Sequence, residues 1–427
     1  TGASNTAVGS QVLAANTTGA SNTAVGKSAL GNNTTGQRNV VLGFNAMDAS
    51  TTGSDSVVVG YEAGGSITTG IENTFLGYYS GQGTTTANYN TGVGASSLQK
   101  NTTGQRNVAV GRVALYNSTT ANDNTAIGYA AGETLTTGGS NTIIGSKSGQ
   151  NLTEGNNNVV IGTEALDADT KGDRNIAIGN QALSAQNFTS STDSYNVAIG
   201  HNSGLSVTTG TSNTLIGGLT GDAITTGSQN VAVGRSALSS NTTASNNVAI
   251  GYQSLDANTT GTSNTAVGHQ SLDSNTTAHN NTAIGYQSLT TNTTGASNTA
   301  LGQGALQANT TASNNTAIGK SALVANTTGS SNVALGRLAL TANTTASLNT
   351  AIGAEALDTN TTGGSNTAIG YAALYANTTA SNNTAVGVNS LKANTTGSTN
   401  TAVGGSSLFN NTTGSRNQAF GYNSLNA

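Results

Sequence analysis

The chain has 427 residues, including 57 Gly but no Pro, Cys or Trp, and only 7% of its residues are charged. Aromatic residues make up 4% of the chain, so we do not expect one large core of bulky side chains. The net charge of -4 and the scattered 13 Lys and Arg argue against a nucleic-acid-binding surface, and no apolar run is long enough to cross a membrane.

A repeat of 17 residues runs through the chain. The glycine that closes phrases such as NTAVG recurs at this spacing from Gly9 to Gly421, with one longer step of 21 residues between Gly179 and Gly200. A fixed short period of this kind is typical of solenoids and fibres. We number the positions of each repeat from this glycine, which is position 1.

The repeat predicts a single domain over residues 1–427. It contains 25 copies, with a four-residue insertion in the coil 179–199. The chain has no initiator Met and starts and stops inside a repeat, so we expect it to be a fragment of a longer chain.

Positions 14 to 17 predict a short strand in every copy. Position 14 is Asn except at Ser56, position 15 is Thr, Val or Ile except at Gln418, and position 17 is always apolar. β-Branched residues favour extended chain, whereas the small residues at positions 1 and 11 favour turns. The sequence therefore predicts a parallel β-solenoid in which each copy forms one coil.

Stacked coils would place equal positions above one another. The Asn side chains of position 14 should then form a ladder in which each amide bonds to the next. The residues assigned to this ladder are Asn5, Asn22, Asn39, Asn73, Asn107, Asn141, Asn175, Asn213, Asn247, Asn281, Asn315, Asn349, Asn383 and Asn417.

Position 16 is Ala in most copies and apolar or Gly in the others, and in a strand it points opposite to positions 15 and 17. A strand that is apolar on both sides is expected where both faces are covered. We predict that one face looks into the coil and that the small residues of position 16 pack against another chain, which implies an oligomer. A flat, exposed Ala face is the alternative.

Positions 5 and 8 vary together. Most copies have Leu at position 5 and a polar residue, usually Asn, at position 8. Six copies have Gly at position 5, and five of these have an apolar residue at position 8, as in Gly64 with Ile67; the sixth pairs Gly81 with Thr84. We interpret this as two positions that fill the same interior volume.

No constellation for catalysis, metal binding or a cofactor is apparent. The chain has three histidines, His201, His269 and His279; the first two share position 2 but lie four coils apart in the predicted stack, and the acidic residues are dispersed. We therefore expect no enzyme activity. The Asn-Thr-Thr triplets match a glycosylation acceptor pattern, which we attribute to ladder roles of Asn and Thr.

Position 2 is the candidate contact position, because it carries exposed aromatic residues that could bind a sugar or a neighbouring fibre. Covering turn backbone or a subunit seam is the competing interpretation. This stripe comprises Phe44, Tyr61, Tyr78, Tyr129, Tyr252, Tyr286, Tyr371 and Tyr422. The insertion within residues 184–196 is a second candidate contact point.

The phrase NTAIGYQSL at residues 281–289, followed by TTNTTG, resembles the head repeats of trimeric autotransporter adhesins and the repeat tracts of phage tail fibres. The resemblance covers the whole chain. It implies a left-handed parallel β-roll in which three chains pack strand against strand. The period here is longer than that of the family, and no coiled-coil stalk or membrane anchor is present in this sequence.

These observations predict a structural segment, shaft or head, of an extracellular homotrimeric fibre on a virion or a bacterial cell. Such a segment would present a binding tip to a host or surface, and its partners would be itself and a cell-surface glycan or other receptor. A self-assembling extracellular filament and a monomeric ice-binding or glycan-binding solenoid are the alternatives.

Overall fold

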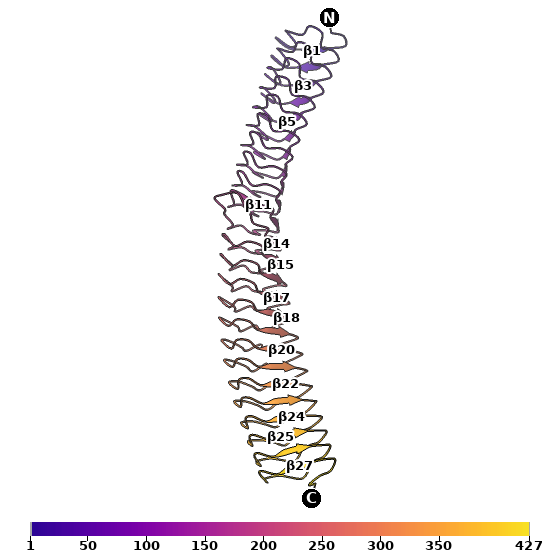
Figure 1. Ribbon diagram of the computed structural model, residues 1–427. Coiled ribbons are helices and arrows are strands. Elements are labelled where there is room, and N and C mark those ends of the chain that lie inside the picture. The colour runs from indigo at the N-terminus through magenta and orange to yellow at the C-terminus, as the bar shows by residue number, and fades with distance from the viewer. Residues whose placement is uncertain (1, 427) are drawn as a thin grey trace. The chain divides into compact units, whose positions relative to one another are not determined.

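The computed structural model describes residues 2–426, and the chain divides into two compact units, one up to Asn213 and one from Thr214. In each unit the repeats form stacked coils, and every coil contributes one three-residue strand at the positions expected (Figure 1). Residues 2–426 contain no helix. The prediction of an all-β parallel solenoid is confirmed.

The main sheet of the first unit contains β1 (Thr6–Val8), β2 (Thr23–Val25), β3 (Val40–Leu42), β4 (Val57–Val59), β5 (Thr74–Leu76), β6 (Thr91–Val93), β7 (Val108–Val110), β8 (Thr125–Ile127), β9 (Thr142–Ile144), β10 (Val159–Ile161), β12 (Ile176–Ile178) and β14 (Val197–Ile199). A separate small sheet pairs β11 (Gly172–Asp173) with β13 (Thr192–Asp193). The second unit contains β15 (Thr214–Ile216), β16 (Val231–Val233), β17 (Val248–Ile250), β18 (Thr265–Val267), β19 (Thr282–Ile284), β20 (Thr299–Leu301), β21 (Thr316–Ile318), β22 (Val333–Leu335), β23 (Thr350–Ile352), β24 (Thr367–Ile369), β25 (Thr384–Val386), β26 (Thr401–Val403) and β27 (Gln418–Phe420).

Within each unit, neighbouring strands pair in parallel and in register, position for position. In the second unit, for example, Ala283 of β19 pairs with Ala300 of β20. The longer repeat of the first unit keeps this register, because Ala177 of β12 pairs with Ala198 of β14 across a spacing of 21 residues. The insertion is therefore absorbed outside the main sheet.

The prediction that the position 16 side chains face outward, against another chain, is wrong. Ala283 and Ala300 are fully buried inside the coils, whereas the position 17 side chains of Ile284 and Leu301 are 37% and 42% exposed. The reason is the thinness of the interior, which has room for only a small side chain at most of these sites. Even at Gly92 a Cβ atom would lie 2.8 Å from the Oγ of Ser80 in the same coil and 2.9 Å from the ring of Phe75 in the preceding coil.

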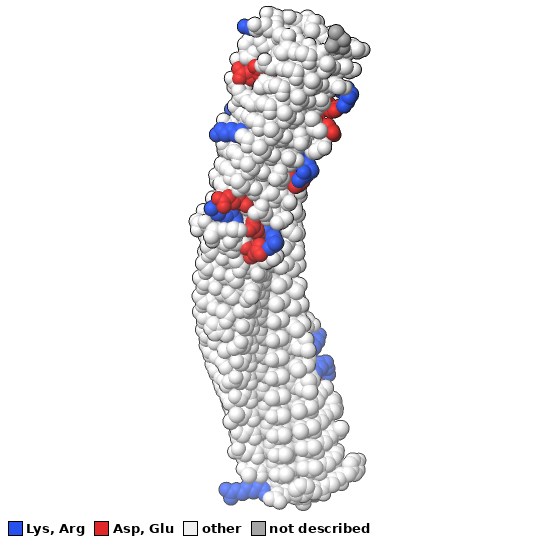
Figure 2. Space-filling view, turned by 45° about the horizontal axis from the view of Figure 1, so that its top comes forward, with Lys and Arg blue, Asp and Glu red and all other residues white. Residues whose placement is uncertain are grey.

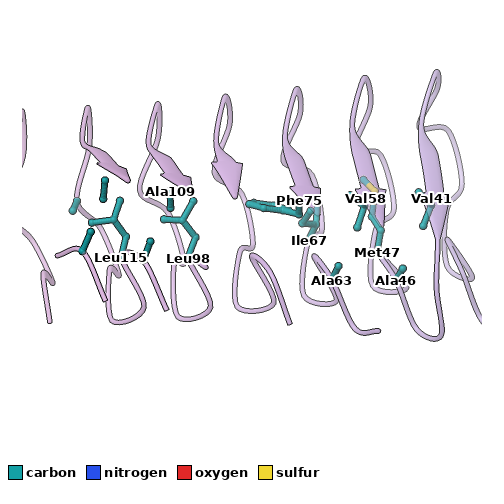
Figure 3. Close-up of a cluster of buried hydrophobic side chains, with 14 of the residues drawn as sticks. Val41, Ala46, Met47, Val58, Ala63, Ile67, Phe75, Leu98, Ala109 and Leu115 are labelled. Carbon is teal, nitrogen blue, oxygen red and sulfur yellow. The ribbon is translucent and has the colours of Figure 1, made fainter. Parts of the chain in front are cut away.

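The exchange between positions 5 and 8 is confirmed. A Cβ atom on Gly64 would lie 2.8 Å from the Cδ1 of Ile67, so the position 8 side chain occupies the space that Leu fills elsewhere. The exception is explained by Phe75, whose ring lies 2.5 Å from a Cβ atom on Gly81. Figure 3 shows Ile67 and Phe75 in the same row of buried side chains.

Positions 3, 5 and 13 adopt a left-handed backbone conformation that is rare for residues other than Gly. In one coil, the φ angles of Gln287, Leu289 and Ser297 are 48°, 54° and 58°. This conformation costs roughly 1–2 kcal/mol for each L-residue. Each of the three backbone N–H groups donates to a carbonyl of a neighbouring coil, at 3.0–3.1 Å, and these bonds offset the strain.

The position 1 glycine is required by both conformation and space. Gly285 has a φ of 132°, and a Cβ atom there would lie 2.7 Å from the carbonyl of Gly302 in the next coil. We expect Gly285→Ala to destabilise its coil by at least about 1–3 kcal/mol. Native-state hydrogen exchange at this coil measures the loss, since a repeat protein need not unfold in two states.

Gly65→Ala is the matched control for this substitution. Gly65 lies at position 6 without a positive φ, and the nearest atom to a new Cβ would be 3.4 Å away. Equal loss of protection in both variants would contradict the requirement at position 1.

Candidate functional site

The Asn column of position 14 connects successive coils chiefly through the backbone. Asn281 donates from Nδ2 to the carbonyl of Gly295 at 2.9 Å, and its Oδ1 accepts the backbone N–H of Asn298 at 2.9 Å. Both partners belong to the next coil, and the side chains are fully buried. The expected bond from amide to amide occurs in some coils, as between Asn332 and Asn315 at 3.2 Å, but it is the longer contact.

A second Asn column lies at position 8, and here the amides do bond to one another. In the second unit, from Asn258 onward, each Nδ2 donates to the Oδ1 of the Asn in the preceding coil at 2.8–3.1 Å. The members are Asn241, Asn258, Asn275, Asn292, Asn309, Asn326, Asn343, Asn360, Asn377, Asn394 and Asn411. Sequence reasoning missed this ladder, although the unbroken run of Asn at one position was the signal. Most of these residues also belong to Asn-Thr-Thr triplets, and their amides are buried.

The position 2 side chains are exposed, and the structure brings only some of them together. The rings of Phe44, Tyr61 and Tyr78 form one stack, with successive centroids 5.2 and 5.5 Å apart. In the second unit His269 lies between Tyr252 and Tyr286, at 5.2 and 5.4 Å. Stacked rings cover each other's faces, so their edges face the solvent.

The remaining residues of the predicted stripe, Tyr129, Tyr371 and Tyr422, lie apart from these stacks. Tyr129 packs under the guanidinium of Arg112, whose Cζ is 5.8 Å from the ring centroid. Tyr79, at position 3, was not predicted but joins the first stack, with its ring centroid 4.1 Å from that of Tyr78. A hydrogen bond with Tyr78, together with burial and the nearby Glu62, raises the pKa of Tyr79 to about 12.

Two open hollows lie at the places where Gly occupies position 6. The hollow at Gly31 measures about 270 Å³ and the one at Gly65 about 220 Å³. Asp48, in the coil between them, lines both. We call the two hollows together the Asp48 groove, lined by Gln11, Ala14, Ser28, Gly31, Asn32, Asn45, Asp48, Glu62, Gly65, Ser66 and Gln82.

The carboxylates of the Asp48 groove are held in place. Gln82 donates from Nε2 to Glu62 at 2.7 Å, and Gln99 donates in turn to Gln82 at 3.0 Å. Partial burial raises the pKa of Asp48, against the opposing effect of the N–H groups of Asp48 and Ala49. These contacts give the groove fixed hydrogen-bond acceptors.

The insertion is organised around a buried carboxylate. Asp169, at position 8, accepts hydrogen bonds from Gln186 Nε2 at 2.8 Å and from the backbone N–H of Phe188 and Gly172 at 3.0 and 3.2 Å. Burial raises the pKa of Asp169, although these donors act in the opposite direction. The arrangement fixes the loop that carries the additional residues.

Breaking the position 8 ladder should have a measurable cost. Asn326→Ala leaves the Oδ1 of Asn309 and the Nδ2 of Asn343 without their ladder partner, at about 1–3 kcal/mol for each buried group left unpaired. We expect faster hydrogen exchange in these three coils. The exposed Thr328→Ala in the same coil is the control, and unchanged exchange in Asn326→Ala would contradict a stabilising ladder.

The described part of the chain, which includes all three histidines, holds no group of three His, Asp or Glu side chains that could bind a metal ion. No helix among residues 2–426 is long and apolar enough to cross a membrane.

No family model matches the chain, and no curated protein matches it in sequence.

Proposed function

We propose that this chain is a structural segment, shaft or head, of an extracellular fibre in which copies of the chain pack through their strand faces. The observation that carries the proposal is an uncharged surface formed by the outward residues of the strands, which are apolar at position 17 and mostly Thr or Val at position 15. We call it the strand ridge. The segment would supply length and stiffness between an attachment point and a binding tip.

The position 17 row of the strand ridge is apolar in both units. Ile127 in the first unit and Ile250 and Leu335 in the second are 39–40% exposed, and their neighbours at position 15 are Thr or Val. No charged residue occupies positions 15 to 17 of any main-sheet strand within residues 2–426. Contiguous apolar surface of this kind usually marks a protein interface, and exposed surfaces of monomers are normally interspersed with charge.

The insertion supports this assignment. It adds four residues to a coil but leaves β12 and β14 paired in register, so the strand ridge continues past it without a break. The additional residues form a bulge with β11 and β13 instead, on the side of the coil away from the main-sheet strands (Figure 1). An interface along the strands would tolerate a bulge only on another side.

The number of chains and the left-handed coil are inferred from the resemblance to trimeric adhesin heads and phage tail fibres. A homotrimer would cover the strand ridge of each copy, on a virion or a bacterial surface. Ice binding by a monomer is less well supported, because one of the two Thr columns is used internally. Thr293 Oγ1, for instance, donates to the carbonyl of Thr310 at 3.0 Å.

The solution mass of the segment, measured by light scattering at micromolar concentration alongside circular dichroism, tests the proposal. We expect a mass of three chains and a β spectrum. A well-folded single chain would overturn the proposal and favour a monomeric binding solenoid. A mass that grows with concentration would favour the self-assembling filament.

Cross-linking tests which face forms the interface, and the absence of native Cys makes the experiment clean. We expect Leu301→Cys, on the strand ridge, to form covalent oligomers with a short thiol-to-thiol cross-linker. Thr294→Cys, exposed on another side of the coil, is the control and should remain a single chain on a denaturing gel. Cross-linking through Thr294→Cys alone would place the interface elsewhere.

A further inference from the structure

The Asp48 groove is distinct from the strand ridge, because its residues occupy positions 3, 6 and 7 rather than 15 and 17. The groove exists because Gly31 and Gly65 provide no side chain at position 6. In other coils of this unit the same position carries Gln99 or Tyr116. A Cβ atom on Gly65 would lie 3.7 Å from Asp48 Oδ1 and 3.4 Å from the carbonyl of Glu62, so a side chain here would fill the hollow.

The groove is lined mainly by hydrogen-bonding groups. Asp48 and Glu62 supply carboxylates, Asn45 and Gln82 supply amides, and Ser66 supplies a hydroxyl. Paired acceptors and donors of this kind suit neighbouring hydroxyl groups, each of which both donates and accepts. The rings of Phe44, Tyr61 and Tyr78 do not line the hollows, but their stack adjoins the groove at Glu62, whose side-chain hydrogen bond with Tyr61 raises the pKa of Tyr61.

The spacing of the two hollows indicates an extended ligand. Gly31 and Gly65 are two coils apart, which corresponds to about 9.6 Å at the usual distance between strands. This is about the length of a disaccharide unit in a linear glycan. A chain of sugars lying along the stacked coils would therefore meet one hollow at every second sugar, with polar groups in both: Ser28 and Asn32 in the first, Glu62 and Ser66 in the second.

We propose that the Asp48 groove binds a linear, neutral glycan through its hydroxyl groups, with the edges of the ring stack against the sugar chain. The charge of the groove excludes anionic glycans as the preferred ligand, because its lining contains two carboxylates and no Lys or Arg. The nearest basic group of the ring column, Lys27, lies 5.6 Å from the ring centroid of Phe44. This binding role goes beyond the structural function and does not depend on the number of chains in the fibre.

Gly65→Gln tests the groove, because Gln is already accommodated at position 6 in neighbouring coils and should fill the hollow without disturbing the fold. Binding is measured by calorimetry on the full chain with hexasaccharides of glucose, galactose, mannose and N-acetylglucosamine. We expect at least one to bind the unmodified chain, and its affinity to fall at least tenfold in Gly65→Gln and in the nearly isosteric Asp48→Asn.

Val324→Gln, at position 6 of the second unit, is the matched control and should bind as the unmodified chain does. Circular dichroism and the solution mass of each variant separate loss of the groove from loss of fold or assembly. Absence of binding to all four hexasaccharides would overturn the proposal. So would equal affinity in Gly65→Gln, or stronger binding of a sulfated hexasaccharide than of the neutral ones.

Discussion

The structure depends on hydrogen bonds that pass from each coil to the next through buried amides. Most Asn side chains at positions 8 and 14 are buried, and an unpaired buried amide would cost about 1–3 kcal/mol. The hydrogen-bonding groups of these amides are satisfied by the same residue at the equivalent position of an adjacent coil, or by a backbone carbonyl of that coil. This requirement enforces the constant period and explains why the one longer coil keeps its strand in register.

Where Ser replaces Asn at position 8, neighbouring polar atoms lose their hydrogen-bond partners. Where Ser50 follows Asn33 at position 8, the Asn33 Oδ1 and Ser50 Oγ atoms have no hydrogen-bond partner among the described residues. Asn101 and Ser118 repeat the same arrangement. In both places the shorter side chain separates the polar column from an apolar residue in the following coil, Ile67 or Leu135.

The thin interior also decides what the molecule exposes. Because the small residues of position 16 turn inward, the aliphatic side chains of position 17 and the Thr, Val or Ile side chains of position 15 face outward and form the strand ridge. Within each unit the regular positions thus build a stack of coils with one uncharged side. Charged residues are few, and Figure 2 shows that most of the surface in view carries no charge. Single departures from the repeat then create local features on these regular coils, as Gly31 and Gly65 at position 6 create the hollows of the Asp48 groove.

The sequence by itself determined the period, the strand positions, the insertion and the shared volume of positions 5 and 8, because each of these is a regularity of residue type along the chain. It also located the aromatic residues of position 2, although not which of them stack. Only the tertiary structure decided which side of the strand faces inward. The alternation of side chains along a strand separates two faces but does not say which of them faces inward. Neither face of these strands carries charge, so residue type did not decide between them. The choice follows from the space left by side chains such as Leu289, which come from the other side of the coil. The ladder at position 8 and the Asp48 groove depend in the same way on residues that become neighbours only when coils stack.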